Sequence, residues 1–431
     1  MSSSFSADYV EEIRKNFPRI ERDFNGTRRI FLDNGAGSLV LGAAAEAEFR
    51  SRIDYSANTD ALYQESKSNE MEILKGRRAV SDLINSPDWH NIFQGESASE
   101  LFFRVAYSLR DYFGKEGNVV STYAEHFANV APYLELKKNR KISELRLARI
   151  RKEDGLIDMS DLSSLVNRKT RLIAITAESN LLGNKTDLKN ISRLARENGA
   201  LFLVDGVHFA PQANVDIGEI DCDFFVFSSY KMFGPRGSFM YVGERALNNL
   251  KPFYVDRNAK QGEGSFLEPG TRDQAIFSAI TAVVDYISRL SLDIQRFRVG
   301  TFPRKRREGV KKGMRRVEEY QESLSRYVLE GIDGVEGLAH IKNVNLYGIS
   351  EMSRVKERGS TFSFNLRNMS DKKAEKIFWE KFKITVVGGS HWNLSHDYYS
   401  NPSMLRVTFL HYNSYEEVKK FLKAVNWISK I

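Results

Sequence analysis

The sequence predicts an α/β protein, with a mostly parallel sheet in a large domain and a smaller α+β domain after it. Between about residues 90 and 230, short continuous apolar runs alternate with stretches of helical periodicity. Parallel sheets that helices cover on both faces are built from such runs. After about residue 290 the pattern changes to long charged helices and isolated strands. We therefore expect a large domain over residues 31–290 and a small domain over residues 291–431, with residues 1–30 packing against the small domain.

The individual elements follow from the positions of these runs. An amphipathic helix is expected over residues 8–17, and an extended run follows at residues 30–32. Runs of four or five apolar residues are typical of buried strands, whereas apolar residues three and four positions apart indicate helices. These patterns predict strands at residues 92–93, 119–121, 172–176, 201–204, 224–227, 361–364, 385–387 and 405–409, and helices at residues 99–113, 129–136, 187–198, 371–382 and 415–427.

Composition narrows the class of protein. With 42% hydrophobic and 28% charged residues, the chain has the balance of a soluble globular protein. No apolar run approaches the roughly 20 residues of a transmembrane helix, and the Ser-rich start lacks the pattern of a secretory signal. The single cysteine, Cys222, cannot form an internal disulfide, and the seven histidines show no zinc-ligand spacing. We expect a cytoplasmic protein that has no metal site.

The charge pattern says little about partners. Lys and Arg number 64 against 56 Asp and Glu, which gives a net charge of +8 spread over a long chain. The densest basic run covers residues 304–316, where Val310, Met314 and Val317 recur at helical spacing. This spacing indicates an amphipathic helix whose basic side faces solvent; a nucleic-acid patch is the alternative. No nucleic-acid motif accompanies the run, so we expect neither a nucleic-acid partner nor a membrane partner.

Polar residues follow three of the apolar strands, where an open parallel sheet binds its ligands. Asp205 follows residues 200–204, Lys231 comes soon after residues 224–227, and Asn180 follows the run that ends at Thr176. Taken singly, Lys231 could be a surface lysine and Asp205 a helix cap. Together they fit a pyridoxal 5'-phosphate site, in which a lysine forms a Schiff base and an acid pairs with the pyridinium nitrogen. Lysine suits this role because partial desolvation makes its amine neutral and nucleophilic.

A phosphate site is expected just before the helix that begins near Glu100. Residues 94–99 read Gln-Gly-Glu-Ser-Ala-Ser and follow the first predicted strand of the sheet. Backbone N–H groups at a helix N-terminus, together with a serine hydroxyl, bind anions well. A serine before a helix is more often only a cap. Its place in the first strand-helix unit is what favours a phosphate site here.

Seven segments, in this order along the chain, resemble the class V aminotransferase family, and in particular its cysteine desulfurase-like branch. They are residues 31–34, 125–132, 179–183, 204–208, 223–237 and 268–271, and Arg406 with residues 412–418. The resemblance implies the pyridoxal phosphate-dependent transferase fold of type I, with a seven-stranded, mostly parallel sheet. It also implies a pyridoxal phosphate cofactor, a small amino-acid substrate and a homodimer with shared active sites.

The resemblance assigns roles to individual residues. Lys231 would carry the cofactor and shuttle protons at the substrate Cα, Asp205 would pair with the ring nitrogen, and His126 would stack on the ring. His208 would lie near the phenolic oxygen. The implied cofactor-binding set is Ala98, Ser99, His126, Asn180, Asp205, His208, Ser228, Tyr230, Lys231, Gly270 and Thr271, with Thr271 reaching the phosphate of a second subunit. The implied substrate-binding set is Asn34, Ala36, Asn180, His391, Trp392 and Arg406.

Two departures from the family pattern matter. Tyr230 stands where the family commonly has a phosphate-binding histidine, and its hydroxyl can also donate. The loop at residues 387–393 has Trp392 at the position where desulfurases place a nucleophilic cysteine, and an indole cannot replace a thiolate. Cys222, the only thiol, is interpreted as a small apolar strand residue. Trp392 and His391 either line a pocket for a large side chain or belong to the core.

These observations predict a pyridoxal phosphate-dependent enzyme, with a carbon–sulfur β-lyase as the leading interpretation. Such an enzyme would convert cysteine or an S-substituted cysteine into pyruvate, ammonia and a sulfur product, and would need no cysteine nucleophile. An aminotransferase, an epimerase, and an atypical cysteine desulfurase or selenocysteine lyase share its first steps and stay open as alternatives. A catalytically silent binding protein is a further alternative, but the presence of both Lys231 and Asp205 counts against it.

Overall fold

A seven-stranded sheet forms the centre of the computed structural model, which describes residues 4–251, 267–271 and 273–431. In spatial order its strands are β2 (Ile92–Gly95), β8 (Ser238–Val242), β7 (Phe224–Ser228), β6 (Leu201–Asp205), β5 (Thr170–Thr176), β3 (Asn118–Thr122) and β4 (Glu144–Ala148). Only β8 runs antiparallel to its neighbours. The expected seven-stranded, mostly parallel sheet is therefore confirmed.

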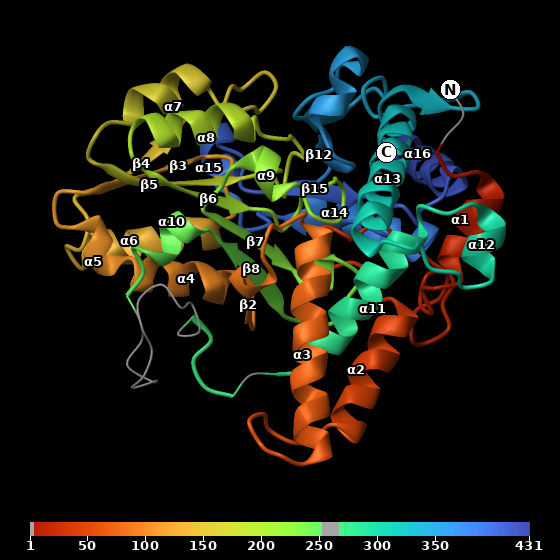
Figure 1. Cartoon of the computed structure of the whole chain (residues 1–431). Coiled ribbons are helices and arrows are strands. Elements are labelled where there is room, and N and C mark those ends of the chain that lie inside the picture. The colour runs from red at the N-terminus through yellow and green to blue at the C-terminus, as the bar shows by residue number, and fades with distance from the viewer. Residues whose placement is uncertain (1–3, 252–266, 272) are drawn as a thin grey trace.

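Successive residues of the central strands face opposite sides of this sheet, as the period of a strand requires. Leu201 and Leu203 pack into one apolar cluster and Phe202 and Val204 into the other. Figure 1 shows helices on both faces. On one side lie α4 (Ala98–Ser108), α5 (Arg110–Phe113), α6 (Ala131–Lys138) and α10 (Glu244–Leu247), and on the other α7 (Met159–Leu165), α8 (Leu188–Glu197) and α9 (Ile217–Ile220). Burial on both faces explains the unbroken apolar runs in the sequence.

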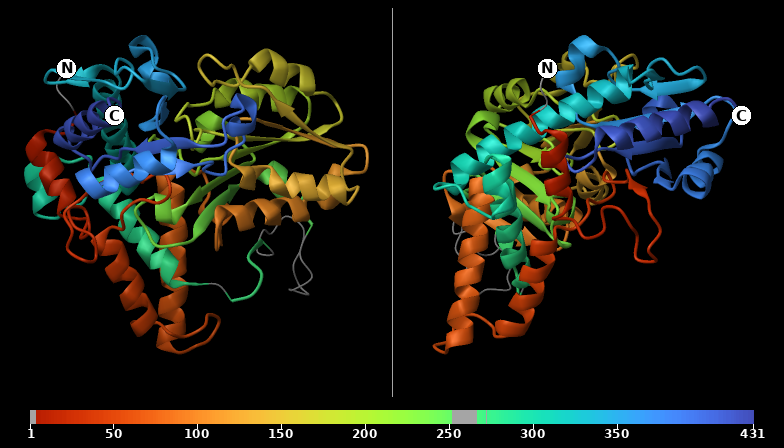
Figure 2. Two further views of the ribbon diagram at one scale, coloured as in Figure 1. Left: turned by 180° about the vertical axis from the view of Figure 1, so that it is seen from behind. Right: turned by 90° about the vertical axis from the view of Figure 1, so that its right-hand side faces the viewer.

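Two long helices extend from the body of the protein as an antiparallel pair. They are α2 (Gly42–Asp54) and α3 (Gln64–Leu83), and both pack against α11 (Ala275–Arg289). Figures 1 and 2 show their far ends projecting well beyond the sheet. Neither helix was predicted from its residues. Charged and small residues dominate both helices, so their apolar periodicity is weak.

A second, four-stranded antiparallel sheet lies in the C-terminal part of the chain. Its strands are β11 (Val344–Tyr347), β12 (Thr361–Leu366), β15 (Met404–Thr408) and β14 (Val387–Gly389), in this order. The helices here are α14 (Asp371–Ile377), continued by the π-helical turn η6 (Phe378–Phe382), α15 (Ser395–Tyr399) and α16 (Tyr415–Ile428). The single strand expected at residues 385–387 is wrong in detail, because β13 (Ile384–Thr385) and β14 belong to different sheets.

The remaining elements connect these parts. The N-terminal helix α1 (Ala7–Arg14) contacts α12 (Ile294–Arg298), and β1 (Ile30–Phe31) pairs with β13 of the C-terminal part. A short hairpin of β9 (Gly331–Ile332) and β10 (Val335–Glu336) lies between α13 (Arg306–Glu330) and β11. Short 3-10 turns are η1 (Trp89–Asn91), η2 (Phe127–Asn129), η3 (Ser229–Lys231) and η5 (Met352–Glu357). The domain boundaries at residues 30 and 290 stay a prediction.

The basic run at residues 304–316 overlaps the start of α13, and several of its side chains have partners. Arg306 contacts Asp82 at 2.8 Å and Asp285 at 3.3 Å. Arg307 shares Asp82 at 3.1 Å. These pairs neutralise part of the basic face. None of the helices in the described ranges combines the length and apolar composition that crossing a membrane requires.

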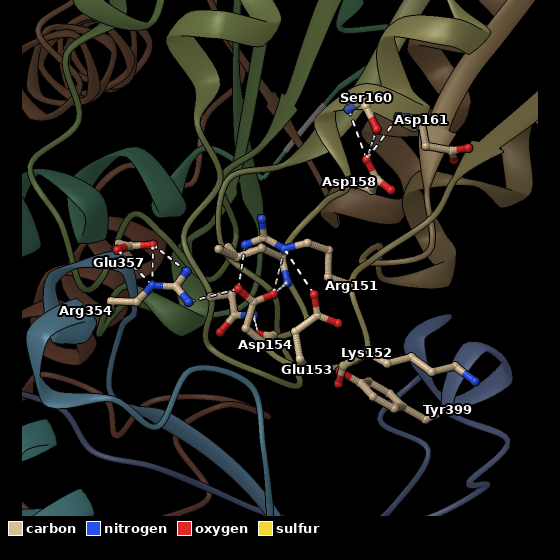
Figure 3. Close-up of polar contacts among 12 residues, drawn as sticks. Arg151, Lys152, Glu153, Asp154, Asp158, Ser160, Asp161, Arg354, Glu357 and Tyr399 are labelled. Carbon is tan, nitrogen blue, oxygen red and sulfur yellow. Dashed lines mark hydrogen bonds and ion pairs between the residues drawn. The ribbon is translucent and has the colours of Figure 1, made fainter.

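A buried carboxylate joins the loop at residues 151–155 to the segment before β12 (Figure 3). Asp154 accepts hydrogen bonds from Arg151 at 3.1 Å, from Arg354 at 2.9 Å and from the Leu156 N–H at 3.1 Å. Burial raises the pKa of Asp154, but these hydrogen bonds outweigh burial and the net pKa is lowered. Two regions about 200 residues apart in the sequence thus meet on one negative charge.

We expect Asp154→Asn to lower the free energy of unfolding by about 2 kcal/mol, because two arginines lose their charged acceptor. Urea denaturation at neutral pH measures the change. Glu153→Gln is the matched control, since Glu153 is exposed and lies 4.0 Å from Arg151. A folded-state pKa below the unfolded value means that the stabilisation is lost as the pH falls through the folded pKa. Equal stability of the two variants at neutral pH would refute the role given to Asp154.

Candidate active site

A pocket lies at the carboxyl ends of β5, β6 and β7. This is the edge of an open parallel sheet where ligands bind. Its walls are formed by Ser97, Ala98, Ser99, Phe102, His126, Ala128, Thr176, Glu178, Asn180, Asp205, Val207, His208, Ser228, Tyr230 and Lys231. Nine of the eleven residues expected to bind the cofactor are thereby brought together.

Lys231 ends the 3-10 turn η3 that follows β7, and its side chain is buried. Its Nζ lies 2.9 Å from Nε2 of His208. Burial, and then the positive charge of Arg406, lower the pKa of Lys231 to about 7. Burial and the nearby Lys231 also hold the pKa of His208 well below its usual value. A large share of Lys231 is therefore neutral near pH 7, which is the state that attacks an aldehyde.

Asp205 is the last residue of β6, and its carboxylate lies in the same pocket. One oxygen accepts a hydrogen bond from the Val207 N–H at 3.0 Å. Burial raises the pKa of Asp205 to about 6, against the effects of this hydrogen bond and of Lys231. A nearby positive charge stabilises the ionised form of a buried carboxylate. Asp205 is therefore suited to pair with a protonated ring nitrogen.

His126 comes just before η2, and its Nδ1 accepts a hydrogen bond from the Ala128 N–H at 3.1 Å. Burial, with the charges of Lys231 and Arg406, lowers the pKa of His126 to about 4. The imidazole is therefore neutral near pH 7, with its hydrogen on Nε2. A neutral flat ring can stack on an aromatic ligand without carrying charge into the pocket.

The first turn of α4 brings phosphate-binding groups to this pocket. Ser97 caps the helix by accepting from the Glu100 N–H at 3.1 Å, and Ala98 and Ser99 are the first helical residues. Their N–H groups have no acceptor within the helix and carry the positive end of its dipole. Ser228 adds a hydroxyl, which lies 3.0 Å from that of Ser238. An anion donor set, a buried acid and a buried amine in one pocket fit pyridoxal phosphate.

The remaining predicted residues lie outside this pocket. Thr271 lines a separate pocket with Arg52 and Tyr55, and Gly270 is its neighbour in the chain. Asn34 uses its amide within the protein, donating to the Thr408 carbonyl at 2.7 Å. Ala36, His391, Trp392 and Arg406 do not line the pocket either, and Trp392 is 73% exposed. Contact of these residues with cofactor or substrate stays a prediction.

Arg406 is buried beside the pocket and faces Asp33 at 3.6 Å. Its Nη1 donates to the Asn180 carbonyl at 3.1 Å. The approach depends on Gly35, where an added Cβ would lie 2.9 Å from Nε of Arg406. Glycine therefore leaves room for the guanidinium next to residues 33–35. A buried cation here attracts a carboxylate into the adjoining pocket.

Two fully buried carboxyl groups were not among the predicted site residues. Glu125 accepts hydrogen bonds from Thr122 at 2.8 Å, from the Thr176 N–H at 3.0 Å and from Asn129 at 2.8 Å. Glu178 lines the pocket and accepts from Gln212. Burial raises the pKa of each to about 8. The sequence carries little sign of either role. Glu125 is simply an acidic residue next to His126, and Glu178 is one that comes soon after an apolar strand.

Known proteins similar to this chain point to one family. A cysteine desulfurase of Salmonella agona (strain SL483) is 28% identical over 444 residues, covering 98% of each chain. The apo structure of a cysteine desulfurase from Thermococcus onnurineus NA1 superposes with a TM-score of 0.81 at 23% identity, covering 100% of both chains. The Escherichia coli cysteine desulfurase CsdA gives a TM-score of 0.78 at 20% identity over 98% of each chain. The two structures show the same fold.

The family description "Aminotransferase class-V" matches residues 30–298 and 309–421. The resemblance of the seven motifs, including that to the desulfurase-like branch, is thereby confirmed. The expected type I fold is confirmed too. The chain therefore belongs to the class V aminotransferase family, and it is a pyridoxal phosphate-dependent enzyme.

Proposed function

We propose that this enzyme is a carbon–sulfur β-lyase, which converts cysteine or an S-substituted cysteine into pyruvate, ammonia and a sulfur product. The observation that carries the proposal is a buried Lys231 with a pKa of about 7, in the same pocket as Asp205, in a chain without a cysteine in its 387–393 loop. The names of the desulfurase relatives support cysteine as the substrate class. A β-lyase needs no thiol on the protein, because the sulfur group leaves the substrate directly.

When bound, pyridoxal phosphate supplies an aldehyde for an amine and a ring that withdraws electrons from the substrate Cα. In the proposed reaction, Lys231 takes the proton from Cα, and the electron pair left there forms a double bond to Cβ. The Cβ–S bond breaks and its electrons leave with sulfur. Hydrolysis of the released three-carbon enamine adds water and gives pyruvate and ammonia.

Other residues of the chain hold the reactants in place. We assign Asp205 to the ring nitrogen, His126 to the face of the ring, and His208 to the phenolic side near Lys231. The α4 N-terminus, with Ser228, would hold the phosphate. Arg406 would bind the substrate carboxylate from beside the pocket, where burial strengthens the attraction. Tyr230 lines the pocket and offers a further hydroxyl donor to the phosphate.

A cysteine desulfurase that works by an atypical route is the second candidate, and the names of the relatives favour it. Such an enzyme would have to pass sulfur to a thiol. Cys222 is the only cysteine of the chain; it is buried, and burial raises the pKa of its thiol. A buried, protonated thiol is a poor nucleophile. An aminotransferase or epimerase would use the same pocket and differ in the steps after proton removal.

The reaction class is tested by incubating purified holoenzyme with cysteine, cystine, cysteine sulfoxides and bulky S-conjugates, while pyruvate is followed with a coupled assay. A β-lyase forms pyruvate from at least one of them. Alanine in place of pyruvate would identify a desulfurase. A keto acid that retains its sulfur would identify an aminotransferase, and a change of configuration alone an epimerase.

Lys231 is predicted to be the residue that binds the cofactor covalently. Borohydride reduction of the holoenzyme followed by peptide mapping should find the pyridoxyl label on Lys231, and Lys231→Ala should carry none. The rate at which apoenzyme captures the cofactor should rise with pH and level off above about 7, because only the neutral amine reacts. Lys185→Ala is the control, since Lys185 pairs with Glu318 outside the pocket. A label on another lysine would overturn the assignment.

Activity is predicted to be independent of Cys222. Cys222→Ala should keep turnover within a few-fold and cost about 1 kcal/mol of stability, as a small change in an apolar environment does. Alkylation of the native holoenzyme with iodoacetamide should leave activity intact. Loss of turnover in a folded Cys222→Ala variant would contradict the β-lyase proposal and favour the desulfurase.

A homodimer that completes the active site is also predicted. Thr271 lies outside the pocket around Lys231, so it can serve a phosphate only in the pocket of a second copy. The nearby α2–α3 pair exposes Phe49, Ile53 and Met71, and the connecting loop exposes Leu62 and Tyr63.

Light scattering at micromolar concentration should give the dimer mass. Phe49→Glu should shift it towards monomer and weaken cofactor retention, whereas Phe24→Glu, at an exposed residue outside these helices, should not. A fully active monomer would contradict this prediction.

A further inference from the structure

The 390–395 loop, which runs from the end of β14 to the first residue of α15, is hydrogen-bonded along one wall of the candidate active site. The Phe127 N–H donates to the Trp392 carbonyl at 2.6 Å, and the Leu394 N–H donates to the Glu125 carbonyl at 2.9 Å. Between these two bonds, His126 pairs with Asn393 in an antiparallel bridge. The backbone on both sides of His126 is therefore held by this loop.

The side chain of Asn393 adds three further hydrogen bonds at the same place. Its amide nitrogen donates to the Ala124 carbonyl at 2.9 Å and to Oδ1 of Asn180 at 2.7 Å. Its oxygen accepts from the Ser395 N–H at 2.8 Å. The side chain is buried, so these bonds satisfy polar groups that water does not reach. Asn393 thus links the loop both to the His126 segment and to Asn180.

Asn180 completes the connection from the other side. Its amide nitrogen donates to the His391 carbonyl at 2.9 Å, while its backbone carbonyl accepts from Arg406 at 3.1 Å. Both ends of the Asn180 side-chain amide are therefore used by the 390–395 loop. The orientation of Asn180 in the pocket depends on where this loop lies.

The backbone of the loop adopts a conformation that needs such support. His391 and Trp392 have φ angles of 49° and 54°, in the left-handed region that residues other than glycine seldom adopt. Such strain persists only where surrounding contacts hold it, and it gathers at functional sites. Here the contacts that hold the turn are those to Phe127, Glu125 and Asn180.

We propose that Asn393 is a positioning residue, which fixes the 390–395 loop so that His126 and Asn180 keep the orientation that cofactor and substrate require. The inference rests on the proposed function, which gives His126 its role, and on the expectation that Asn180 binds cofactor and substrate. It goes beyond that function in naming a residue that touches neither ligand. The proposal also means that this loop is a fixed support behind the pocket wall rather than an arm that carries sulfur to an acceptor.

Hydrogen exchange of the holoenzyme tests the connection directly. Asn393→Ala should speed amide exchange about tenfold in peptides covering residues 123–130 as well as in those covering residues 390–396, because the bridge opens as a unit. Asn401→Ala is the matched control: this asparagine donates to Tyr347 at 2.9 Å and to Asn365 at 2.8 Å, away from the pocket wall. The control should leave residues 123–130 unchanged. Unchanged exchange there in Asn393→Ala would overturn the proposal.

Two measurements on the same holoenzymes separate positioning from stability alone. In Asn393→Ala the visible circular dichroism of the bound cofactor should fall and the KM for the amino acid should rise about tenfold, with a smaller change in kcat. Asn401→Ala should match the wild type in both. Faster exchange with unaltered dichroism and KM would also overturn the positioning role. If the alanine variant does not fold, Asn393→Ser makes the same comparison. The exchange and dichroism results do not depend on which reaction is catalysed, so they can fail independently of the β-lyase proposal.

Discussion

The active site is organised around one buried amine. Lys231 ends the turn η3 that follows β7, and desolvation and Arg406 bring its pKa to about 7. A buried charged amine would be costly, so the fold favours a neutral amine and sets a buried acid, Asp205, in the same pocket. His126 and His208 stay neutral for a related reason, because both are buried and lie near the positive charges of Lys231 and Arg406. The pocket can accept a cofactor that brings its own charges.

The sheet and most of this pocket could be predicted from the sequence because the signals there are local. Continuous apolar runs mark the strands, and Asp205 and Lys231 come soon after them. The resemblance to the family added His126, Asn180 and the phosphate-binding residues of α4. The helices α2 and α3 carry no comparable signal, because much of their length is polar and they pack mainly on α11.

Residues whose role depends on tertiary contacts could not be predicted. Glu125 and Glu178 are acidic residues in the sequence, and only the folded chain buries them and raises their pKa values. Asn393 meets Asn180 across more than 200 residues of chain, and no periodicity reports such a contact. For Trp392, the motif predicted its place in the loop. Whether its side chain is buried or exposed became clear only from the folded chain.

In the proposed reaction, sulfur leaves the substrate without passing through a thiol of the enzyme. Relatives named as cysteine desulfurases share the fold, yet the loop of this chain has Trp392 in place of a cysteine and is held against the pocket wall. The decisive measurement is intact-protein mass spectrometry after a single turnover with cysteine, quenched under non-reducing conditions. We expect a polypeptide of unchanged mass and one released sulfide for each substrate consumed. A persulfide on Cys222 would contradict it.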